Sequence, residues 1–325
     1  MNFGRQLIRI AVLPLALGAA SGALAQAGYP TKPVKIVVPY SAGGPADIYA
    51  RFVGDRLQKA TGQPFVIENR PGAGAIIGTD AVAKSAPDGY TLLMMSNTHT
   101  VNESLFTRKP YTLLRDLAPI APVNYSDLIL VVHPSVPANN LKELIALAKA
   151  KPGALNYASS GPGTPYHMAG ELFKAMAGID VVHIPHKGSA EARTDVLAGN
   201  VQMMFDAITT MAPLVQSGKV RAIATSGKTR SPITPNVPTL NEAGLPGYDA
   251  VIWLGMMAPA GTPKPIIDAL NADIQKIANA PDVKDTWAKQ GAVPMHMSAE
   301  EFGKFMEQDI QKWAKVVKFS GARVD

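Results

Sequence analysis

The sequence predicts an α/β protein with two lobes and a cleft between them. The main observation is a repeated unit in which a short strand ends in a glycine-containing loop and the loop opens a helix. The unit occurs three times, with loops at residues 39–47, 72–74 and 159–164. Such loops point backbone N–H groups away from the strand ends, so three of them predict several helix N-termini around one cleft. A second observation is length, because 325 residues exceed one ordinary core and fit two lobes or one large α/β unit.

The composition describes a globular chain with little charge to attract a large anionic partner. Hydrophobic residues make up 47% and charged residues 17%, and the formal net charge is +6. Removing Arg5 and Arg9 with a leader segment takes 31 basic residues to 29 against 25 acidic ones, which leaves +4. No block of lysine and arginine with interleaved aromatic residues occurs, so no nucleic-acid partner is predicted. The chain has no cysteine and therefore no disulfides.

The first 25 residues have the pattern of a signal peptide. A basic start is followed by an apolar run at 10–20 and by the small-x-small cleavage pattern Ala-Leu-Ala at 23–25. We expect the mature chain to begin near Gln26 in an exported, periplasmic protein. A retained membrane anchor is disfavoured because Pro14 breaks the run, which is shorter than the ~20 residues of a membrane span.

Up to about residue 125 the chain repeats strand, loop and helix. Apolar runs bounded by turn residues predict strands, and apolar residues at helical spacing predict helices. The predicted strands are 34–38, 65–68 and 90–95, and the predicted helices are 48–58 and 75–84. This order is typical of a parallel sheet. The segment 97–100 follows the third strand and is expected at the same carboxyl edge as the glycine loops.

A second α/β lobe is predicted after about residue 125. Its strands are expected at 128–132, 156–158, 181–184, 201–205 and 222–225. Its helices are expected at 140–150, 166–176, 190–197 and 212–217.

A late apolar strand at 251–257 is expected to carry the chain back to the first lobe. Two crossings, near 124–128 and 250–257, then predict a two-strand hinge. The predicted lobes are 26–125 plus 255–325 and 126–254. Three helices finish the chain, at 264–279, 281–290 and 299–318.

Three familiar catalytic patterns are disfavoured. The glycine run 72–78 is similar to a dinucleotide-binding fingerprint, but the next strand ends in Ser96 and Asn97, where that fingerprint needs an acidic residue. No cofactor is therefore predicted. No G-x-S-x-G pattern supports a serine hydrolase. Pro185 lies between His183 and His186 and prevents them from sharing a helical face, so no metal site is predicted.

Four residues at the predicted cleft have both structural and functional interpretations. Asp47 lies at a helix start, where the helix dipole alone favours a carboxylate, or it accepts from a ligand N–H or orients water. His167, in the first turn of another helix, is either near a ligand or a partly exposed polar residue. Asp206 ends a predicted strand, where no helix dipole explains a carboxylate, so it is a better candidate than Asp47 for a functional residue. Tyr40 is either a core ring or a cleft wall.

Five segments together resemble one family. They are 39–47 (PYSAGGPAD), 68–74 (ENRPGAG), 87–93 (PDGYTLL), 160–167 (SGPGTPYH) and 237–244 (VPTLNEAG). In this order they resemble the Bug family of periplasmic solute-binding receptors linked to tripartite tricarboxylate transporters. The resemblance implies a type II-like periplasmic binding protein with two lobes, each a mixed, mainly parallel sheet flanked by helices. It also implies a monomer, without catalysis, that binds a small organic carboxylate and delivers it to membrane transporter subunits.

In that family, backbone N–H groups, hydroxyls and ordered water hold the ligand rather than an arginine clamp. The resemblance implies that the ligand-binding residues are Tyr40, Ser41, Ala42, Asp47, Asn97, Thr98, Ser159, Ser160, Gly163, Thr164, His167 and Asp206. The chain departs from the family's usual pattern at Ser41, where proline is common, and at His186, where tyrosine is common. Aliphatic di- and tricarboxylates, aromatic acids, amino acids and nicotinate-like compounds remain open as ligands.

The alternative function is a secreted enzyme in which Asp206 and a cleft histidine act as an acid/base pair. Stoichiometry distinguishes the two, because a receptor returns one equivalent of ligand unchanged and an enzyme converts it. For a receptor, loop 159–164 and the helix N-terminus after it are expected to bind the carboxylate. Thr164→Val is then expected to weaken binding roughly ten- to a hundredfold and to change stability little.

Overall fold

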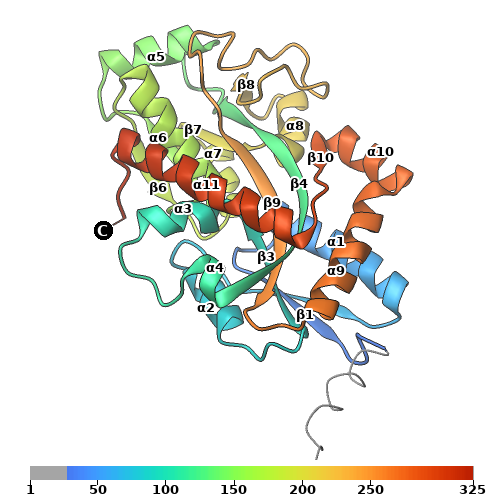
Figure 1. Ribbon diagram of the computed structural model, residues 1–325. Helices are drawn as coiled ribbons and strands as arrows, with labels where there is room; N and C mark the ends of the chain where they lie inside the picture. Colours follow the sequence, from blue (N-terminus) through green and yellow to red (C-terminus); the bar gives the residue numbers. More distant parts are fainter. Residues whose placement is uncertain (1–27, 325) are drawn as a thin grey trace, which may run out of the picture.

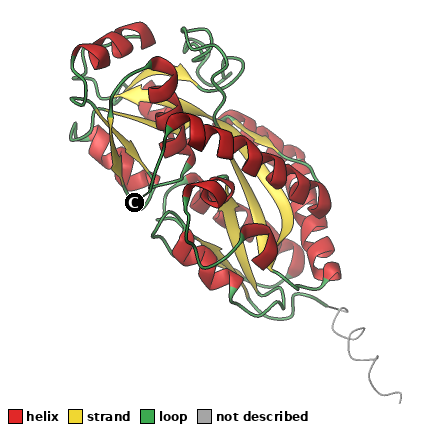
Figure 2. Cartoon of the chain, turned by 60° about the vertical axis from the view of Figure 1, so that its left-hand side comes forward, coloured by secondary structure: helices red, strands yellow, loops and turns green. Residues whose placement is uncertain are grey.

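The computed structural model describes residues 28–324, which form two α/β lobes (Figures 1 and 2). The predicted signal peptide, residues 1–25, lies outside the described residues. Ten strands are joined by hydrogen bonds along the path β2-β1-β3-β9-β4-β7-β5-β6, with β8 and β10 paired to β4. The predicted two-lobed α/β fold is confirmed. No helix within residues 28–324 combines the length and the apolar character that crossing a membrane requires.

The first sheet contains five strands and a short antiparallel edge. Its order is β2 (Phe65–Asn69), β1 (Val34–Val38), β3 (Thr91–Ser96), β9 (Val251–Pro259) and β4 (Leu117–Val132), with β10 (Ala292–Pro294) beyond β4. β1 is parallel to β2 and β3, whereas β9 is antiparallel to β3 and β4. The helices before β4 or after β9 are α1 (Pro45–Thr61), α2 (Ile76–Ala83), α3 (Thr98–Leu105), α4 (Leu113–Asp116), α9 (Lys264–Asn279), α10 (Pro281–Gln290) and α11 (Ala299–Ser320).

The second sheet repeats this plan. Its order is β6 (Val182–Pro185), β5 (Asn156–Ser159), β7 (Met203–Ala207) and the end of β4, to which β8 (Arg221–Thr225) also pairs. β5 is parallel to β6 and β7, and β4 is the antiparallel strand. The helices between β4 and β9 are α5 (Leu141–Ala150), α6 (Pro165–Ala177), α7 (Ser189–Leu197) and α8 (Ile208–Gln216).

Two strands connect the lobes. β4 pairs with β9 from Leu117 to Asp127 and with β7 from Leu128 to Val132, so its two parts belong to different sheets. β9 brings the chain back into the first sheet at Val251. The predicted two-strand hinge is therefore confirmed. α11 crosses in front of the hinge in Figure 1 and packs on α3 and α6, so it touches elements on both sides.

Both faces of β4 are buried where it enters the second sheet. Leu128 and Leu130 pack in one apolar cluster, and Ile129 and Val131 pack in another. Alternate residues of a strand point to opposite faces, so the sheet is covered on both sides, as expected for α/β layers. This burial holds the end of β4 in the second lobe.

The structure corrects the strand prediction at the first crossing. β4 begins at Leu117, eleven residues before the predicted start. Pro119 and Pro122 obscured it, because proline donates no ladder hydrogen bond and is usually excluded from inner strands. The register with β9 shifts at both prolines, so irregular pairing accommodates them.

The structure also adds a helix after β3. Residues 98–105 form α3, although Thr98, Thr100 and Val101 are β-branched and disfavour helices. All three side chains are buried, and α3 packs on α11. Contacts with a distant segment therefore override the local preference. The three-residue strand β10 was too short to predict from its sequence.

Candidate functional site

A small cavity lies between the two lobes, where α1 and α6 begin. Its volume is about 20 Å³, which is room for about one water molecule, so the lobes are closed on each other. Both helices start with a proline, which suits a helix N-terminus because proline has no N–H to leave unpaired. The cavity is lined by Tyr40, Ser41, Gly44, Pro45, Ala46, Ser96, Ser160, Pro165, Tyr166, Ser189 and Ile252.

A chain of hydroxyl groups forms the wall of the first lobe. The Tyr40 hydroxyl lies 2.7 Å from the Ser96 hydroxyl, which in turn donates to the Thr98 hydroxyl at 2.9 Å. Burial raises the pKa of Tyr40 to about 12, so this hydroxyl remains a donor at neutral pH. The Tyr40 ring belongs to the apolar core and also lines the cavity, so both interpretations of this residue hold.

Asp47 holds the loop before α1 in shape. Its carboxylate accepts from the Gly43 N–H, from Arg51 Nε and from the Asn69 side-chain amide, each at 3.0 Å. Burial disfavours the charged form, but these hydrogen bonds outweigh it and lower the pKa of Asp47. The carboxylate is therefore ionised and engaged within the first lobe, and it does not line the cavity.

The loop before α6 uses its polar groups to shape itself. The Thr164 hydroxyl donates to the Gly161 carbonyl at 2.7 Å and accepts from the His167 N–H at 3.4 Å, so it caps the helix. The Gly163 N–H donates to Nδ1 of His167 at 3.0 Å. The expectation that Thr164→Val leaves stability nearly unchanged is therefore wrong, because losing such a cap typically costs about 0.5–2 kcal/mol.

Two stacked histidines lie beneath this loop. The rings of His167 and His183 are 4.2 Å apart and nearly parallel, and Nε2 of His183 lies 2.6 Å from the Ser159 hydroxyl. Burial lowers the pKa of His167 to about 4 and that of His183 to about 3. Both rings are neutral at pH 7. They do not line the cavity, and His167 is buried rather than partly exposed.

Asp206 is fully buried and faces Arg193 of α7. Nη1 of Arg193 donates to Oδ2 of Asp206 at 2.7 Å, and the Ala207 N–H donates to the other carboxylate oxygen at 2.8 Å. Burial raises the pKa of Asp206, and the guanidinium offsets only part of this effect. The second guanidinium nitrogen, Nη2, donates across the cleft to the Gly43 carbonyl at 2.8 Å. The sequence analysis did not single out Arg193.

Three of the twelve predicted ligand-binding residues line the cavity, namely Tyr40, Ser41 and Ser160. The other nine are not part of its wall: Ala42, Asp47, Asn97, Thr98, Ser159, Gly163, Thr164, His167 and Asp206. Asn97 and Thr98 are buried, and the Asn97 amide donates to the Val251 carbonyl at 2.9 Å. Ala42 is exposed.

Several wall residues were not predicted. Ser96 immediately precedes the predicted Asn97, and Ser189 begins a helix, so position along the chain could have suggested both. Ile252 lies within an apolar strand and has no such signal. Tyr166 follows a predicted loop, and its buried hydroxyl has no hydrogen-bond partner within residues 28–324. Burial raises the pKa of the Tyr166 hydroxyl well above its usual range, and the nearby Ser189 hydroxyl offsets only part of this effect.

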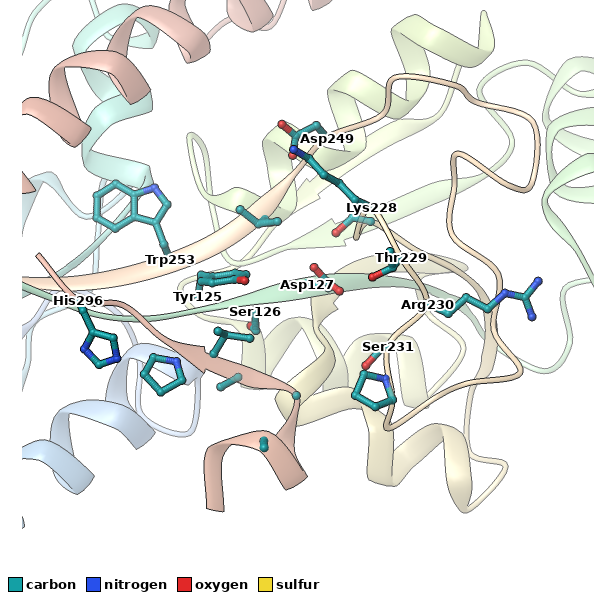
Figure 3. A pocket seen from close by; sticks show the side chains of 18 of the residues that line it. Tyr125, Ser126, Asp127, Lys228, Thr229, Arg230, Ser231, Asp249, Trp253 and His296 are labelled. Carbon is teal, nitrogen blue, oxygen red and sulfur yellow. The ribbon is translucent and has the colours of Figure 1, made fainter. Parts of the chain in front are cut away.

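A larger cavity, about 1060 Å³, lies on the other side of the hinge strands, and we call it the hinge groove (Figure 3). Val251 and Trp253 of β9 line the groove, whereas Ile252 between them lines the small cavity. Because alternate strand residues point to opposite faces, the two cavities lie on opposite sides of β9. We therefore expect a rotation of the lobes about the hinge strands that closes the small cavity to widen the hinge groove. The small cavity is the candidate ligand site, because two helix N-termini meet there.

Comparison with known proteins places this geometry in a family. Residues 49–321 match the model of the "Tripartite tricarboxylate transporter family receptor". "Protein BugT" of Bordetella pertussis is 38% identical over 326 residues, covering 100% of both chains.

Solved structures agree with this match. An R. palustris protein with adipate has a TM-score of 0.88 at 33% identity, covering 90% of this chain and 98% of its own. MatC from Rhodopseudomonas palustris with bound malate has a TM-score of 0.85 at 32% identity, covering 89% of this chain and 100% of its own. The periplasmic binding protein BugD has a TM-score of 0.86 at 34% identity, covering 91% and 99%. The chain therefore belongs to the tripartite tricarboxylate transporter receptor family, together with its Bug-type relatives.

Proposed function

We propose that this receptor closes on a small organic carboxylate at the N-termini of α1 and α6 and hands it to a tripartite tricarboxylate-type transporter. The carrying observation is the hydroxyl-rich wall of the cavity, with Tyr40, Ser41 and Ser96 on one side and Ser160, Tyr166 and Ser189 on the other. No lysine or arginine is part of this wall. Neutral donors and helix N-termini would therefore hold the anion, and the Tyr166 hydroxyl is a donor without a partner among residues 28–324.

A carboxylate panel tests this function. Thermal shift with malate, adipate, benzoate, glutamate and nicotinate should identify at least one stabilising ligand, because binding to the native state adds RT ln(1 + [L]/Kd) to stability. Titration calorimetry should then give one site per chain. Affinity should depend only weakly on ionic strength, because the site presents no cationic side chain for salt to screen. No response across the panel would contradict the proposal.

Ser160→Ala should isolate a ligand contact better than Thr164→Val. Ser160 lines the cavity, and a hydrogen bond to a charged group contributes about 1.5–3 kcal/mol, so binding should weaken roughly ten- to a hundredfold by calorimetry. Ser217→Ala, at an exposed serine just after α8, is the matched control and should bind like wild type. If Ser160→Ala binds with the affinity of wild type, the Ser160 hydroxyl does not contact the ligand.

The geometry does not favour the enzyme alternative. Asp206 is buried against Arg193, and none of the histidines lines the cavity, so no acid/base pair faces a bound molecule there. Recovering the bound carboxylate unchanged after prolonged incubation should exclude turnover. Conversion of the ligand by wild-type protein would instead support the enzyme.

We propose lobe boundaries at residues 26–125 plus 255–325 and 126–254, with one binding site per monomer. The change of β4 from one sheet to the other between Asp127 and Leu128 supports the first crossing. The antiparallel pairing of β9 with β3, which starts at Leu254, supports the second.

Export should remove the first 25 residues. Residues 23–25 form the expected cleavage pattern, and family members are periplasmic binding proteins. Mass spectrometry of a periplasmic extract should therefore find a chain that begins near Gln26. An intact Met1 in a membrane fraction would support the anchor instead.

A further inference from the structure

We propose that Arg193 is a latch that populates the closed form of this receptor without touching the ligand, an inference that rests on the proposed function. Arg193 lies on α7 in the second sheet's part of the chain, and its side chain is only 13% exposed. Nη1 binds Asp206 in the same lobe, and Nη2 reaches the Gly43 carbonyl in the loop before α1. One guanidinium thus joins the two lobes.

The latch is anchored firmly on its own side. Asp206 has no exposed surface and also accepts from the Ala207 N–H at 2.8 Å, so its carboxylate has a fixed position. Arginine stays protonated and presents its donors in a rigid planar fork. With Nη1 held on Asp206, the direction of Nη2 is set before the lobes meet.

The partner of the latch is also held in place. Gly43 donates its N–H to Asp47, which is fixed in turn by Arg51 and Asn69. The Gly43 carbonyl is therefore presented by a loop that is rigid within the first lobe. A hydrogen bond between two such fixed groups forms only at the closed angle of the hinge, and little side-chain entropy is lost in forming it.

Two further hydrogen bonds across the cleft, both made by Ser41, lie next to the Arg193–Gly43 bond. The Ser41 hydroxyl donates to Oε1 of Glu191 at 3.2 Å, and the Ser41 N–H donates to the Lys187 carbonyl at 3.4 Å. The Lys187 N–H donates to the other carboxylate oxygen of Glu191 at 3.1 Å, which holds that side chain toward the cleft. Together with the Arg193–Gly43 bond, three hydrogen bonds therefore join the loop before α1 to the segment 187–193 of the other lobe.

Arg193 acts on affinity through the lobe equilibrium, because it is not part of the cavity wall. A group that stabilises only the closed form raises the fraction of receptor that can retain ligand. Dissociation requires the lobes to open, so loss of the latch should raise koff. Ligand can enter only the open form, because the closed cavity has room for about one water molecule, so kon should rise in proportion to the open fraction of the ligand-free receptor.

The hinge groove offers a way to measure closure without ligand. The chain has no cysteine, so Thr229→Cys and Lys284→Cys give a unique pair for spin labels. Both residues are exposed and line the groove, Thr229 on the loop after β8 and Lys284 on α10 (Figure 3 labels Thr229). The distance between the labels should lengthen as the cleft closes.

Arg193→Lys is the test variant. It keeps a charge beside Asp206, but a single ammonium cannot serve Asp206 and Gly43 as the fork does. We expect the long-distance, closed population in ligand-free protein to fall about tenfold to a hundredfold relative to the open one. If the variant unfolds, the neutral pair Arg193→Gln with Asp206→Asn repeats the test without a buried charge.

Arg221→Lys is the matched control. Arg221 also donates to backbone carbonyls, those of Val136 and Ala138, but both lie within the second lobe. The closed population of the Arg221→Lys variant should therefore equal that of wild type. The latch proposal is wrong if ligand-free wild type shows no closed population. It is also wrong if Arg193→Lys has the same closed population as wild type. With malate or adipate as probe, koff should rise, and kon should rise by the same factor as the open fraction that the label distances report. Failure of both probes to bind would count against the proposed function, and the label distances would still decide the latch.

Discussion

Gly188→Ala is expected to weaken carboxylate binding roughly ten- to a hundredfold while leaving the free energy of unfolding unchanged. Gly188 has extended backbone angles (φ −170°, ψ 164°), which alanine adopts without strain. A Cβ there would lie 2.7 Å from the Ser41 Cβ of the facing lobe, closer than atoms tolerate. The lobes must then stay further apart than in this structure. A carboxylate needs more room than the one water molecule that fits here, so affinity falls by the ligand contacts that the added spacing removes. Losing about one hydrogen bond to the charged ligand would account for the expected factor.

Calorimetric titration of Gly188→Ala measures the ligand affinity, and urea unfolding of the same protein measures the free energy of unfolding. Gly303→Ala on α11 is the control, because its Cβ would be 3.5 Å from Pro119, an ordinary contact. A Gly188→Ala variant that binds like wild type would show that the structure's closed form is not the binding form.

Stability is expected to fall as the pH drops from about 6.5 to about 4. Burial lowers the pKa of His99 to about 4, as it does for His167, and that of His183 to about 3. Unfolded histidine titrates near 6.5, so in this window the unfolded chain binds protons that the native chain does not. Each such proton makes the free energy of unfolding decrease by about 1.4 kcal/mol per pH unit as pH falls. The contribution of the three rings is fully present above pH 6.5.

Urea unfolding at several pH values between 4.5 and 7 measures this slope. His99→Gln should reduce it by up to about 1.4 kcal/mol per pH unit, whatever its effect at pH 7. This variant is informative because His99 is fully buried between Thr79 and Ser96. An unchanged slope in His99→Gln would mean that other groups control the acid response.

Local signals predicted the helices with clear ends. The bounds of α9 and α10 agree with prediction, because prolines mark both starts and Gly291 ends α10 in a left-handed conformation. Asn140 caps α5 as expected, with its side chain accepting from the Glu143 N–H. These signals act over four or five residues, so the sequence alone displays them.

Elements that depend on distant partners were not predictable in the same way. Pro119 and Pro122 argue against a strand until the shifted pairing with β9 is seen. α3 contains β-branched residues and is helical because α11 packs on it. Propensity measures a local preference, and here burial against another element decided the outcome.

The sequence by itself determined the two α/β lobes, the hinge and two of the three loops predicted at the cleft, because strand–glycine–helix units consist of consecutive residues. The third loop, 72–74, is not part of the cavity wall. It also supplied candidate donors such as Thr164, Asp47 and Asp206, but it does not show which donors and acceptors are already paired. Tertiary structure decided that, since Thr164 caps α6 and Asp206 holds Arg193. It also brought Tyr166, Ser189 and Ile252 to one cavity, because only the packing of α6, α7 and β9 makes residues from three separate elements neighbours.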